Sequence, residues 1–108
     1  MVVGIGCDIV EINRFQRNTE ALALRILSKK EQELFYTYSN HRQLEYLAGH
    51  FAAKEAIVKA MDQNCLLSDF EILYKDHKPI VKKEGYEIHI SISHEKEYAI
   101  AYVIVQRS

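Results

Sequence analysis

Apolar residues follow one another along this chain in patterns that predict a strand first, then helices, then more strands. Residues 2–10 are rich in Val and Ile, which is typical of a buried strand. Gly4, Gly6 and Asp8 alternate on one side of that strand. Because glycine has no side chain, we expect another backbone or a ligand to approach closely there.

Helical spacing dominates the next fifty residues. A short helix is expected over residues 21–27, and Ser28-Lys29-Lys30-Glu31 has the spacing of a capping box for a second helix ending near Tyr38. After a break at residues 39–41, a long helix is expected over residues 43–61. Apolar residues nearly surround the long helix, which is typical of a central helix or of one at a subunit contact.

The C-terminal part alternates apolar and polar residues, as half-buried strands do. Residues 62–64 are expected to form a loop and residues 76–79 a turn. The expected strands are residues 70–74, a strand opening at 80, residues 86–93 with Ile88, Ile90 and Ile92 on one face, and residues 98–105. Strands after a helical block predict one α+β domain over residues 1–108, with helices packed on a largely antiparallel sheet.

Composition narrows the function classes. A chain of 108 residues with 48% apolar content is long enough for one core and argues against disorder. A net charge of -1 gives no general signature of nucleic-acid binding. No apolar run approaches the ~20 residues that cross a bilayer, and the N-terminus lacks the pattern of a secretory signal. We therefore expect a cytoplasmic protein, with Cys7 and Cys65 as free thiols and no zinc site.

An acid, Glu55, interrupts the most apolar part of the long helix and shares a helical side with Lys59. Desolvating an unpaired charge is costly, so this carboxylate must be paired, protonated or bound to a metal. A second acid, Asp8, interrupts the first strand. Two carboxylates suit Mg²⁺, which completes its shell with water and substrate phosphates, and Glu11 could join them. The alternatives are an ordinary Glu–Lys helix pair and, for Asp8, a turn or capping role.

Two further groups of polar residues stand out. Ser91, Ser93 and His94 end an alternating strand, where they could reach a phosphate or a ribose. A Ser/His nucleophile is disfavoured, because adjacent residues point apart and no third member is evident. Arg14 and Arg25 belong to a local basic group that could dock an acidic partner or simply face solvent.

Three blocks of the chain, in order, resemble the holo-acyl-carrier-protein synthases. They are Gly4–Ile12, Leu47–Ala56 followed by Lys59-Ala60, and Ile90–His94 followed by Tyr98–Ala101, with Lys78-Pro79 matching the turn before the last block. Gly-Ile-Gly alone would be weak, whereas Phe-Ala-Ala-Lys-Glu on a helix together with the opening Asp is specific. The resemblance spans nearly the whole chain and implies a 4′-phosphopantetheinyl transferase-like fold.

The resemblance implies that the protein moves 4′-phosphopantetheine from coenzyme A to a serine of apo acyl carrier protein, which supports fatty acid biosynthesis. It implies that Asp8 and Glu55 bind Mg²⁺ and that Lys59 lies close to the coenzyme A phosphates, so these three are the expected catalytic residues. Phosphoryl-type transfer depends mainly on positioning and charge neutralisation. The base that deprotonates the serine is either Glu55 or a metal-bound water positioned by one of the two acids.

The same resemblance assigns the remaining site residues. Besides Lys59, the residues expected to bind the coenzyme are Lys54, Ser93, His94 and His50. Arg14 and Arg25 match basic positions that receive the acidic helix of the carrier. A homotrimer with active sites shared between neighbouring subunits is expected, with no nucleic-acid or membrane partner.

Two positions depart from the family pattern. The family often has Arg where this chain has His50, and an imidazole has an unperturbed pKa of ~6.5. Any phosphate contact made by that Arg is therefore expected to weaken or become pH-dependent here. Residues 61–66 are shorter than the family's loop and lack its glycines. These departures motivate one alternative, a non-catalytic protein that binds acyl carrier proteins. Another metal-dependent phosphotransfer enzyme or a nuclease is disfavoured by the near-neutral charge and the lack of a dense acidic cluster.

Overall fold

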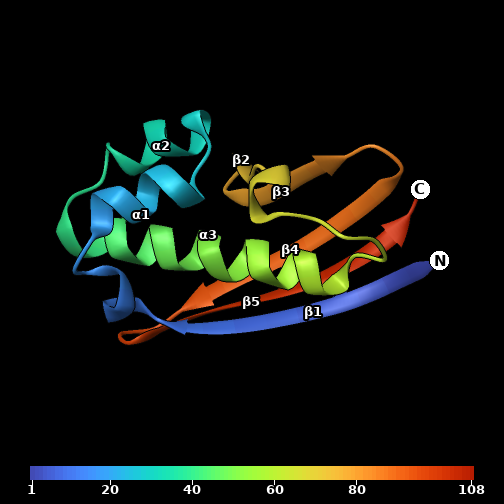
Figure 1. Ribbon diagram of the computed structural model, residues 1–108, viewed down its shortest axis with the longest axis horizontal. Coiled ribbons are helices and arrows are strands. Elements are labelled where there is room, and N and C mark those ends of the chain that lie inside the picture. Colours follow the sequence, from blue (N-terminus) through green and yellow to red (C-terminus); the bar gives the residue numbers. More distant parts are fainter.

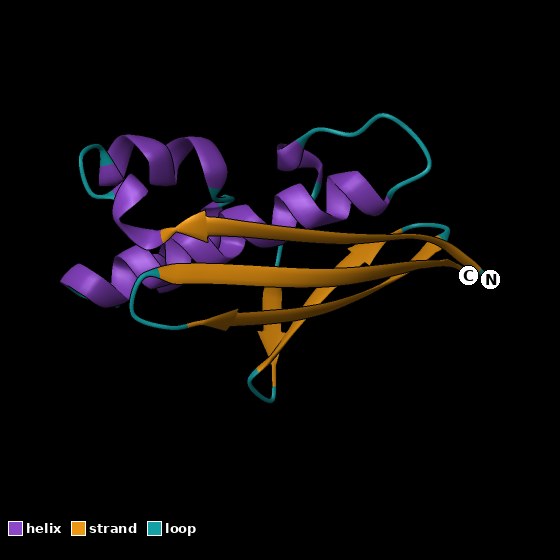
Figure 2. Ribbon diagram, turned by 90° about the horizontal axis from the view of Figure 1, so that it is seen from below, coloured by secondary structure: helices purple, strands orange, loops and turns teal.

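The computed structural model describes residues 1–108 and places all helices on one face of a five-stranded sheet (Figure 1, Figure 2). The α-helices are α1 Thr19–Ile26, α2 Lys29–Phe35 and α3 Asn40–Ala60, with 3₁₀ turns η1 Ile12–Phe15 and η2 Leu67–Asp69. The strands are β1 Val2–Glu11, β2 Leu73–Lys75, β3 Lys78–Lys83, β4 Tyr86–His94 and β5 Tyr98–Arg107. None of the helices has the length and apolar content needed to span a membrane.

The sheet is antiparallel throughout, in the order β1-β5-β4-β3-β2. This confirms the predicted α+β class. The alternation expected in β4 is also confirmed, because Ile88, Ile90 and Ile92 are partly covered while the residues between them are exposed. The inner face of β5 supplies four fully buried side chains to the core, namely Ala99, Ala101, Val103 and Val105.

The long helix α3 is the centre of the domain, as its apolar surround predicted. It lies along β1 and β5, and η1, α1, α2 and η2 pack on its other sides. Its core-facing residues are mostly small or aliphatic: Leu44, Leu47, Ala48, Ala52, Ala53, Ala56, Ile57 and Ala60. Small side chains on α3 let it lie close to the sheet, and this proximity determines the geometry of the site described below.

Several predicted boundaries were wrong. The capping box of Ser28 and Glu31 is present, but α2 ends at Phe35 rather than near Tyr38. The predicted break at residues 39–41 is shorter than expected, because α3 already begins at Asn40. The strand predicted over residues 70–74 begins only at Leu73 as β2, since Phe70 instead caps the turn η2 and is buried in the core.

Candidate active site

Strand β1 and helix α3 touch backbone to backbone, as the glycines of β1 predicted. A methyl group added at Gly4 would lie 2.0 Å from the carbonyl oxygen of Ala60, and one added at Gly6 would lie 2.0 Å from that of Ala56. The strand β1 and the helix α3 therefore run in opposite directions, and two residues along β1 correspond to four along α3. The two lengths match, since two strand residues advance about 6.8 Å and four helical residues about 6 Å.

The next residue on this face of β1 is Asp8, and it is paired with Lys59. The Lys59 ammonium donates to Oδ1 of Asp8 at 3.1 Å and to the carbonyl oxygen of Cys7 at 3.0 Å. The Asp8 side chain is only 16% exposed, whereas that of Lys59 is 54% exposed. Asp8 is thus held between β1 and α3, while the lysine remains free to move toward a ligand.

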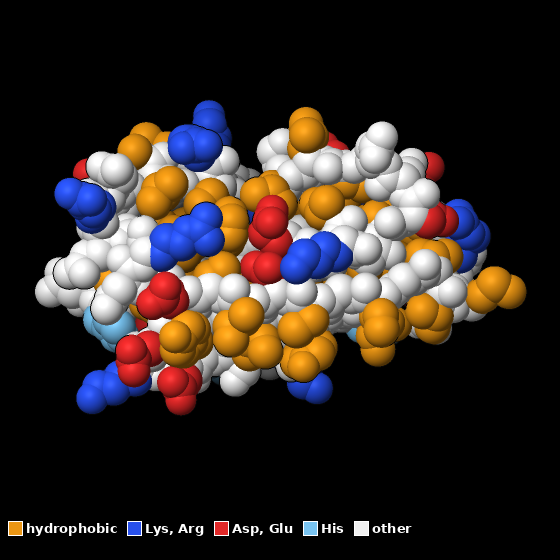
Figure 3. All heavy atoms as spheres, turned by 60° about the horizontal axis from the view of Figure 1, so that its bottom comes forward, with side chains coloured by type: hydrophobic (Ala, Val, Ile, Leu, Met, Phe, Trp, Pro, Cys, Tyr) orange, Lys and Arg blue, Asp and Glu red, His pale blue; other side chains and the backbone are white.

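Glu55 lies on the same flank of α3, one turn before Lys59. Helical side chains tilt toward the N-terminus of their helix, which brings Glu55 level with Asp8 in the register set by Gly4 and Gly6. The Glu55 side chain is half-buried, yet it makes no hydrogen bond and no ion pair within the chain. In Figure 3 acidic side chains lie beside basic ones in the middle of the face that is drawn.

This arrangement offers one carboxylate, Asp8, in contact with an exposed cation, Lys59, and a second carboxylate, Glu55, on the same flank of α3. Nowhere does the chain gather three or more His, Cys, Asp or Glu side chains in a way that could hold a metal ion. Asp8 and Glu55 therefore make up the protein's own contribution to any cation site here. Two carboxylates fit Mg²⁺, which commonly takes one or two from the protein.

Two residues expected to bind the coenzyme, Lys54 and His50, lie elsewhere and are each only 1% exposed. The Lys54 ammonium donates to Oε1 of Glu31 at 2.6 Å and to the carbonyl oxygen of Ile26 at 2.7 Å. The His50 ring lies 3.0 Å from Oε2 of Glu31 and 2.9 Å from the Tyr74 hydroxyl. Within the single chain their polar atoms are enclosed and already paired, although His50 also lines a pocket that contains His94. Coenzyme binding by these two residues stays a prediction.

Burial and hydrogen bonding act in opposite directions on this network. Burial alone would raise the pKa of Glu31, but hydrogen bonds from His50 and Lys54 outweigh it and lower the pKa to about 2. Burial lowers the pKa of His50 despite its hydrogen bond to Glu31, so the ring is neutral near pH 7. Burial also raises the pKa of Tyr74 to about 12. Glu31 and Lys54 are thus a buried ion pair, with neutral His50 and Tyr74 beside it.

Sequence reasoning missed Glu31 as the partner of this network. The capping-box spacing identified Glu31 only as a helix start. The available signal was the pair His50 and Lys54, four residues apart in a helix whose surround is apolar. A lysine that is buried needs an acid from another element.

His94 and Ser93, also expected near the coenzyme, lie at the end of β4 and are both exposed. His94 lines a pocket of about 200 Å³ with Arg42, His77 and Pro79 among its walls. Its Nδ1 is 3.6 Å from Oε2 of Glu45. Within one chain, neither His94 nor Ser93 contacts Asp8 or Lys59 through a hydrogen bond or an ion pair.

Arg14 and Arg25, the predicted docking residues, are brought together by the fold. Both line a hollow of about 280 Å³ whose other walls are apolar: Phe15, Leu22, Ile26, Phe51 and Leu67. The Arg14 guanidinium lies 5.3 Å from the centre of the Phe51 ring. Two cations at the rim of an apolar hollow suit an acidic helix with an apolar side chain between its charges.

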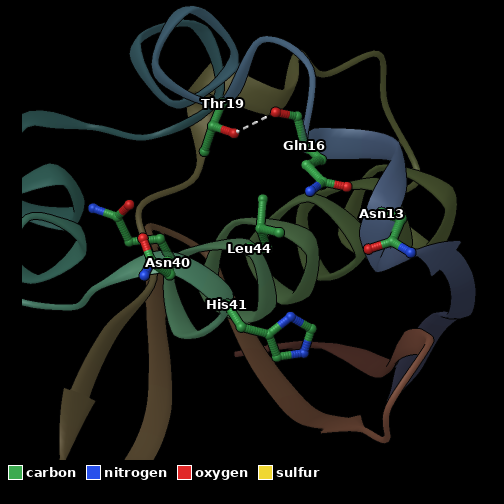
Figure 4. A pocket seen from close by; sticks show the side chains of 7 residues that line it. Asn13, Gln16, Thr19, Asn40, His41 and Leu44 are labelled. Atoms are coloured by element: carbon green, nitrogen blue, oxygen red, sulfur yellow. Dashed lines mark hydrogen bonds between the residues drawn. The ribbon is translucent and has the colours of Figure 1, made fainter.

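A second hollow, which the sequence did not predict, lies between η1 and the starts of α1 and α3 (Figure 4). It measures about 430 Å³ and is lined by Asn13, Gln16, Thr19, Asn40, His41, Gln43 and Leu44. Uncharged amides dominate it, so its walls carry no fixed charge for a phosphate group. None of the predicted catalytic residues lines it.

The glycine-free segment after α3 is tied to the sheet by its own polar contacts. Asp62 accepts a hydrogen bond from the Tyr86 hydroxyl at 2.8 Å and forms an ion pair with Arg107. Met61 is buried beneath this segment. These contacts connect the end of α3 to β4 and β5, so the segment's position depends on side chains rather than on glycines.

Comparisons with known proteins show which family the chain belongs to. The family model described as the 4′-phosphopantetheinyl transferase superfamily matches residues 4–103. The holo-[acyl-carrier-protein] synthase of Geobacillus sp. (strain WCH70) is 44% identical over 117 residues, covering 99% of this chain and 98% of the relative. The enzyme of the same name from Mycoplasma mycoides subsp. mycoides SC is 40% identical over 107 residues, covering 98% and 96%.

A solved structure gives the same result for the fold. The holo-(acyl-carrier-protein) synthase of Bacillus anthracis str. Ames, crystallised in complex with CoA (3′,5′-ADP), superimposes with a TM-score of 0.91 at 38% identity, covering 100% of this chain and 99% of the other. Matches of this extent leave no part of the chain unaccounted for. The chain belongs to the 4′-phosphopantetheinyl transferase superfamily and is an enzyme of its holo-acyl-carrier-protein synthase type.

Proposed function

We propose that this enzyme transfers 4′-phosphopantetheine from coenzyme A to a serine of an apo acyl carrier protein in a magnesium-dependent reaction, giving the holo carrier and adenosine 3′,5′-bisphosphate. The observation that carries the proposal is the contact of Asp8 with Lys59 where β1 meets α3, with Glu55 unpaired one turn before Lys59 on the same helix. Relatives along the full chain are named for this activity, and one is solved with CoA (3′,5′-ADP).

The donor set fits a magnesium ion. Asp8 and Glu55 would hold it, since Glu55 has no partner within the chain and Asp8 has only the mobile Lys59. When bound, the ion would neutralise charge on the pyrophosphate and on the leaving group. Lys59 would release Asp8 and add its positive charge at the same phosphate oxygens. The serine proton would go either to Glu55 or to a water positioned by one of the two acids, because binding a cation lowers the proton affinity of Glu55 itself.

Substrate binding uses surfaces on either side of this point. We place the coenzyme toward the end of β4, with Ser93 and His94 as contacts, and His94 shares its pocket with Arg42. We place the acidic helix of the carrier across the apolar hollow between Arg14 and Arg25. His94 and Asp8 do not meet within one chain, which is the pattern expected if two subunits complete each active site.

A homotrimer is proposed on the same grounds and on the outer face of the sheet. That face carries large exposed apolar side chains in register, with Ile5 opposite Ile104 and Cys7 opposite Tyr102. Ile5 is 72% and Tyr102 60% exposed in the single chain, and a row of apolar side chains runs along one side of Figure 3. A patch of this kind on a monomer indicates a protein interface.

We also propose that the enzyme acts in the cytoplasm and supports fatty acid biosynthesis. Both cysteines are free, which is the state expected of thiols in a reducing compartment. The holo carrier that the reaction produces is the form that carries acyl chains as thioesters.

The decisive experiment is the intact mass of an apo acyl carrier protein after incubation with the enzyme, coenzyme A and Mg²⁺, with EDTA in a parallel sample. The expected result is a gain of one phosphopantetheinyl group that EDTA abolishes. A carrier that binds the protein but gains no mass would support a non-catalytic binding protein instead. A gain that persists in EDTA would contradict the metal role of Asp8 and Glu55.

A further inference from the structure

The Glu31 carboxylate has no capacity left for a ligand. Its Oε1 accepts from the Lys54 ammonium and from the backbone N–H of Ser28, both at 2.6 Å. Its Oε2 lies 3.0 Å from Nδ1 of His50 and accepts from the backbone N–H of Ile72 at 2.9 Å. Four partners saturate a carboxylate, whose oxygens offer about four acceptor sites. This acid therefore joins α2, α3 and the segment before β2 rather than binding a substrate.

Lys54 extends the same network to α1. Its ammonium donates to the carbonyl oxygen of Ile26, the last residue of α1. This helix has only eight residues, and isolated helices shorter than about 12–15 residues are marginal in water. Its orientation therefore depends on contacts such as this one. Lys54 is followed directly by Glu55 on α3, so one rigid helix holds both the end of α1 and a proposed site residue.

We propose that Glu31 and Lys54 are positioning residues for carrier binding, which fix the end of α1, and with it Arg25 and the apolar hollow, relative to Glu55. The inference rests on the proposed function, in which Arg14 and Arg25 receive the carrier. Ile26 itself lines that hollow beside Arg25. Movement of the end of α1 therefore changes the docking surface without touching Asp8 or Lys59.

The test separates positioning from stability with two variants. Lys54→Met keeps the apolar stem but leaves the Glu31 charge buried and unpaired, so it is expected to be unstable. The double variant Glu31→Gln/Lys54→Met removes both charges, but the Gln amide can accept from only one of the two backbone N–H groups, so its melting temperature should recover part of the loss. It still lacks the bond from residue 54 to the carbonyl oxygen of Ile26. Lys82→Met, on an exposed position of β3, makes the same chemical change outside the network.

Initial rates with carrier and coenzyme A varied separately give the first readout. In the double variant the carrier KM should rise about tenfold, as small misplacements of binding groups do, while the coenzyme A KM stays within about twofold of the wild type. Lys82→Met should change neither. A double variant with a recovered melting temperature and a wild-type carrier KM would overturn the proposal, as would a rise confined to the coenzyme A KM.

A second readout does not depend on transfer. Amide hydrogen exchange should become faster over residues 19–28 of the double variant than in the wild type, with β4 unchanged. Unaltered exchange over residues 19–28 would overturn the positioning role whatever the transfer activity. Faster exchange in an enzyme that transfers nothing would instead support the network and contradict the proposed function, so the two failures are distinguishable.

Discussion

Two acidic clusters contact α3, and they differ in how completely the protein pairs them. Glu31 is 1% exposed and has four hydrogen-bonding partners. Asp8 has one side-chain partner, Lys59, and Glu55 has none within the chain. A saturated carboxylate can only stabilise the fold, whereas a carboxylate short of partners is available for a cation or a proton. The number of missing partners, rather than burial, distinguishes the acids that we propose for catalysis from the structural one.

The two clusters are separated by a single step in the sequence. Lys54 completes the buried pair with Glu31, and the next residue, Glu55, is half-buried and unpaired. Consecutive residues on an α-helix point about 100° apart. Lys54 and Glu55 therefore point to different sides of α3. A substitution in one cluster does not change a side chain that contacts the other.

Glu55→Gln is expected to have the largest effect, and it tests whether Glu55 differs from Glu31 in its role. The amide keeps the shape of the side chain but removes the charge that a cation or a proton needs. We expect transfer to fall by ~10²–10⁴-fold, the range for losing a general acid or base, with little change in melting temperature because Glu55 has no partner to lose. Rates at saturating Mg²⁺ and thermal melts measure the two effects.

Glu87→Gln is the matched control for that variant, because Glu87 is an exposed acid on β4. It should leave both rate and melting temperature unchanged. Wild-type turnover of Glu55→Gln at saturating Mg²⁺ would contradict the metal and proton roles together. A large drop in its melting temperature would show that Glu55 stabilises the fold, as Glu31 does.

Glu31→Ala should show the opposite profile. It leaves the Lys54 ammonium buried without its counter-charge, and removing one partner of a buried ion pair costs about 3–5 kcal/mol. At roughly 4–8 °C per kcal/mol for a domain of this size, the melting temperature should fall by more than about 12 °C. A fall of only about 2 °C in a thermal melt would mean that the network contributes little to stability.

Gly6→Ala tests the contact that builds the open site. The added methyl group would meet the carbonyl oxygen of Ala56 at 2.0 Å, and both groups belong to backbone that cannot rotate away. Overpacking of this kind costs typically 1–3 kcal/mol. Since β1 carries Asp8 and α3 carries Glu55, moving the two apart should also raise the Mg²⁺ concentration needed for half-maximal rate.

Cys7→Ala provides the comparison, because Cys7 is the neighbouring residue on β1 and points to the outer face of the sheet. Its Mg²⁺ dependence should match that of the wild type. If Gly6→Ala is measurably destabilised but keeps the wild-type Mg²⁺ dependence, the packing of β1 on α3 does not determine the assembly of the acidic site.

How far the sequence predicts this molecule depends on whether a feature is local. The alternation of β4, the capping box at Ser28 and the glycines on one side of β1 are local patterns, and all three predictions were confirmed. The close contact of β1 with α3 followed from those glycines. The ends of α2 and β2 were misjudged, because burial of Phe70 and packing at Phe35 are tertiary effects that local propensity does not contain.

From the sequence we expected Glu55 to be the acid that burial forces into a pair. The structure shows that Glu31 meets this condition in full. In the sequence Glu31 looks like a surface residue, because it lies in a short helix rich in charged residues. Lys54 and His50, which we expect near the coenzyme, also complete this buried network. Which acid receives which base is a long-range pairing, and a pattern within one helix cannot determine it.

The smallest expected effect is on the pH dependence of stability, and it tests one residue of the buried network, His50. Burial lowers the pKa of His50 below its ordinary value of 6.5, so at mildly acidic pH the unfolded chain binds a proton that the folded protein does not. Stability must therefore fall as the pH drops below about 6.5. Glu31 adds a second loss at lower pH, between 4.5 and about 2, because its pKa is also depressed on folding.

His50→Gln isolates the first of these losses. The amide can still donate to Glu31 and accept from the Tyr74 hydroxyl, but it does not titrate. Thermal melts of both proteins from pH 7.5 to 5 should show a steeper decline for the wild type, with the difference confined to the range below about 6.5. The other four histidines are present in both proteins, so their contributions to the pH dependence cancel when the two are compared. Parallel declines would mean that folding does not lower the pKa of His50, which would contradict a ring kept neutral by burial.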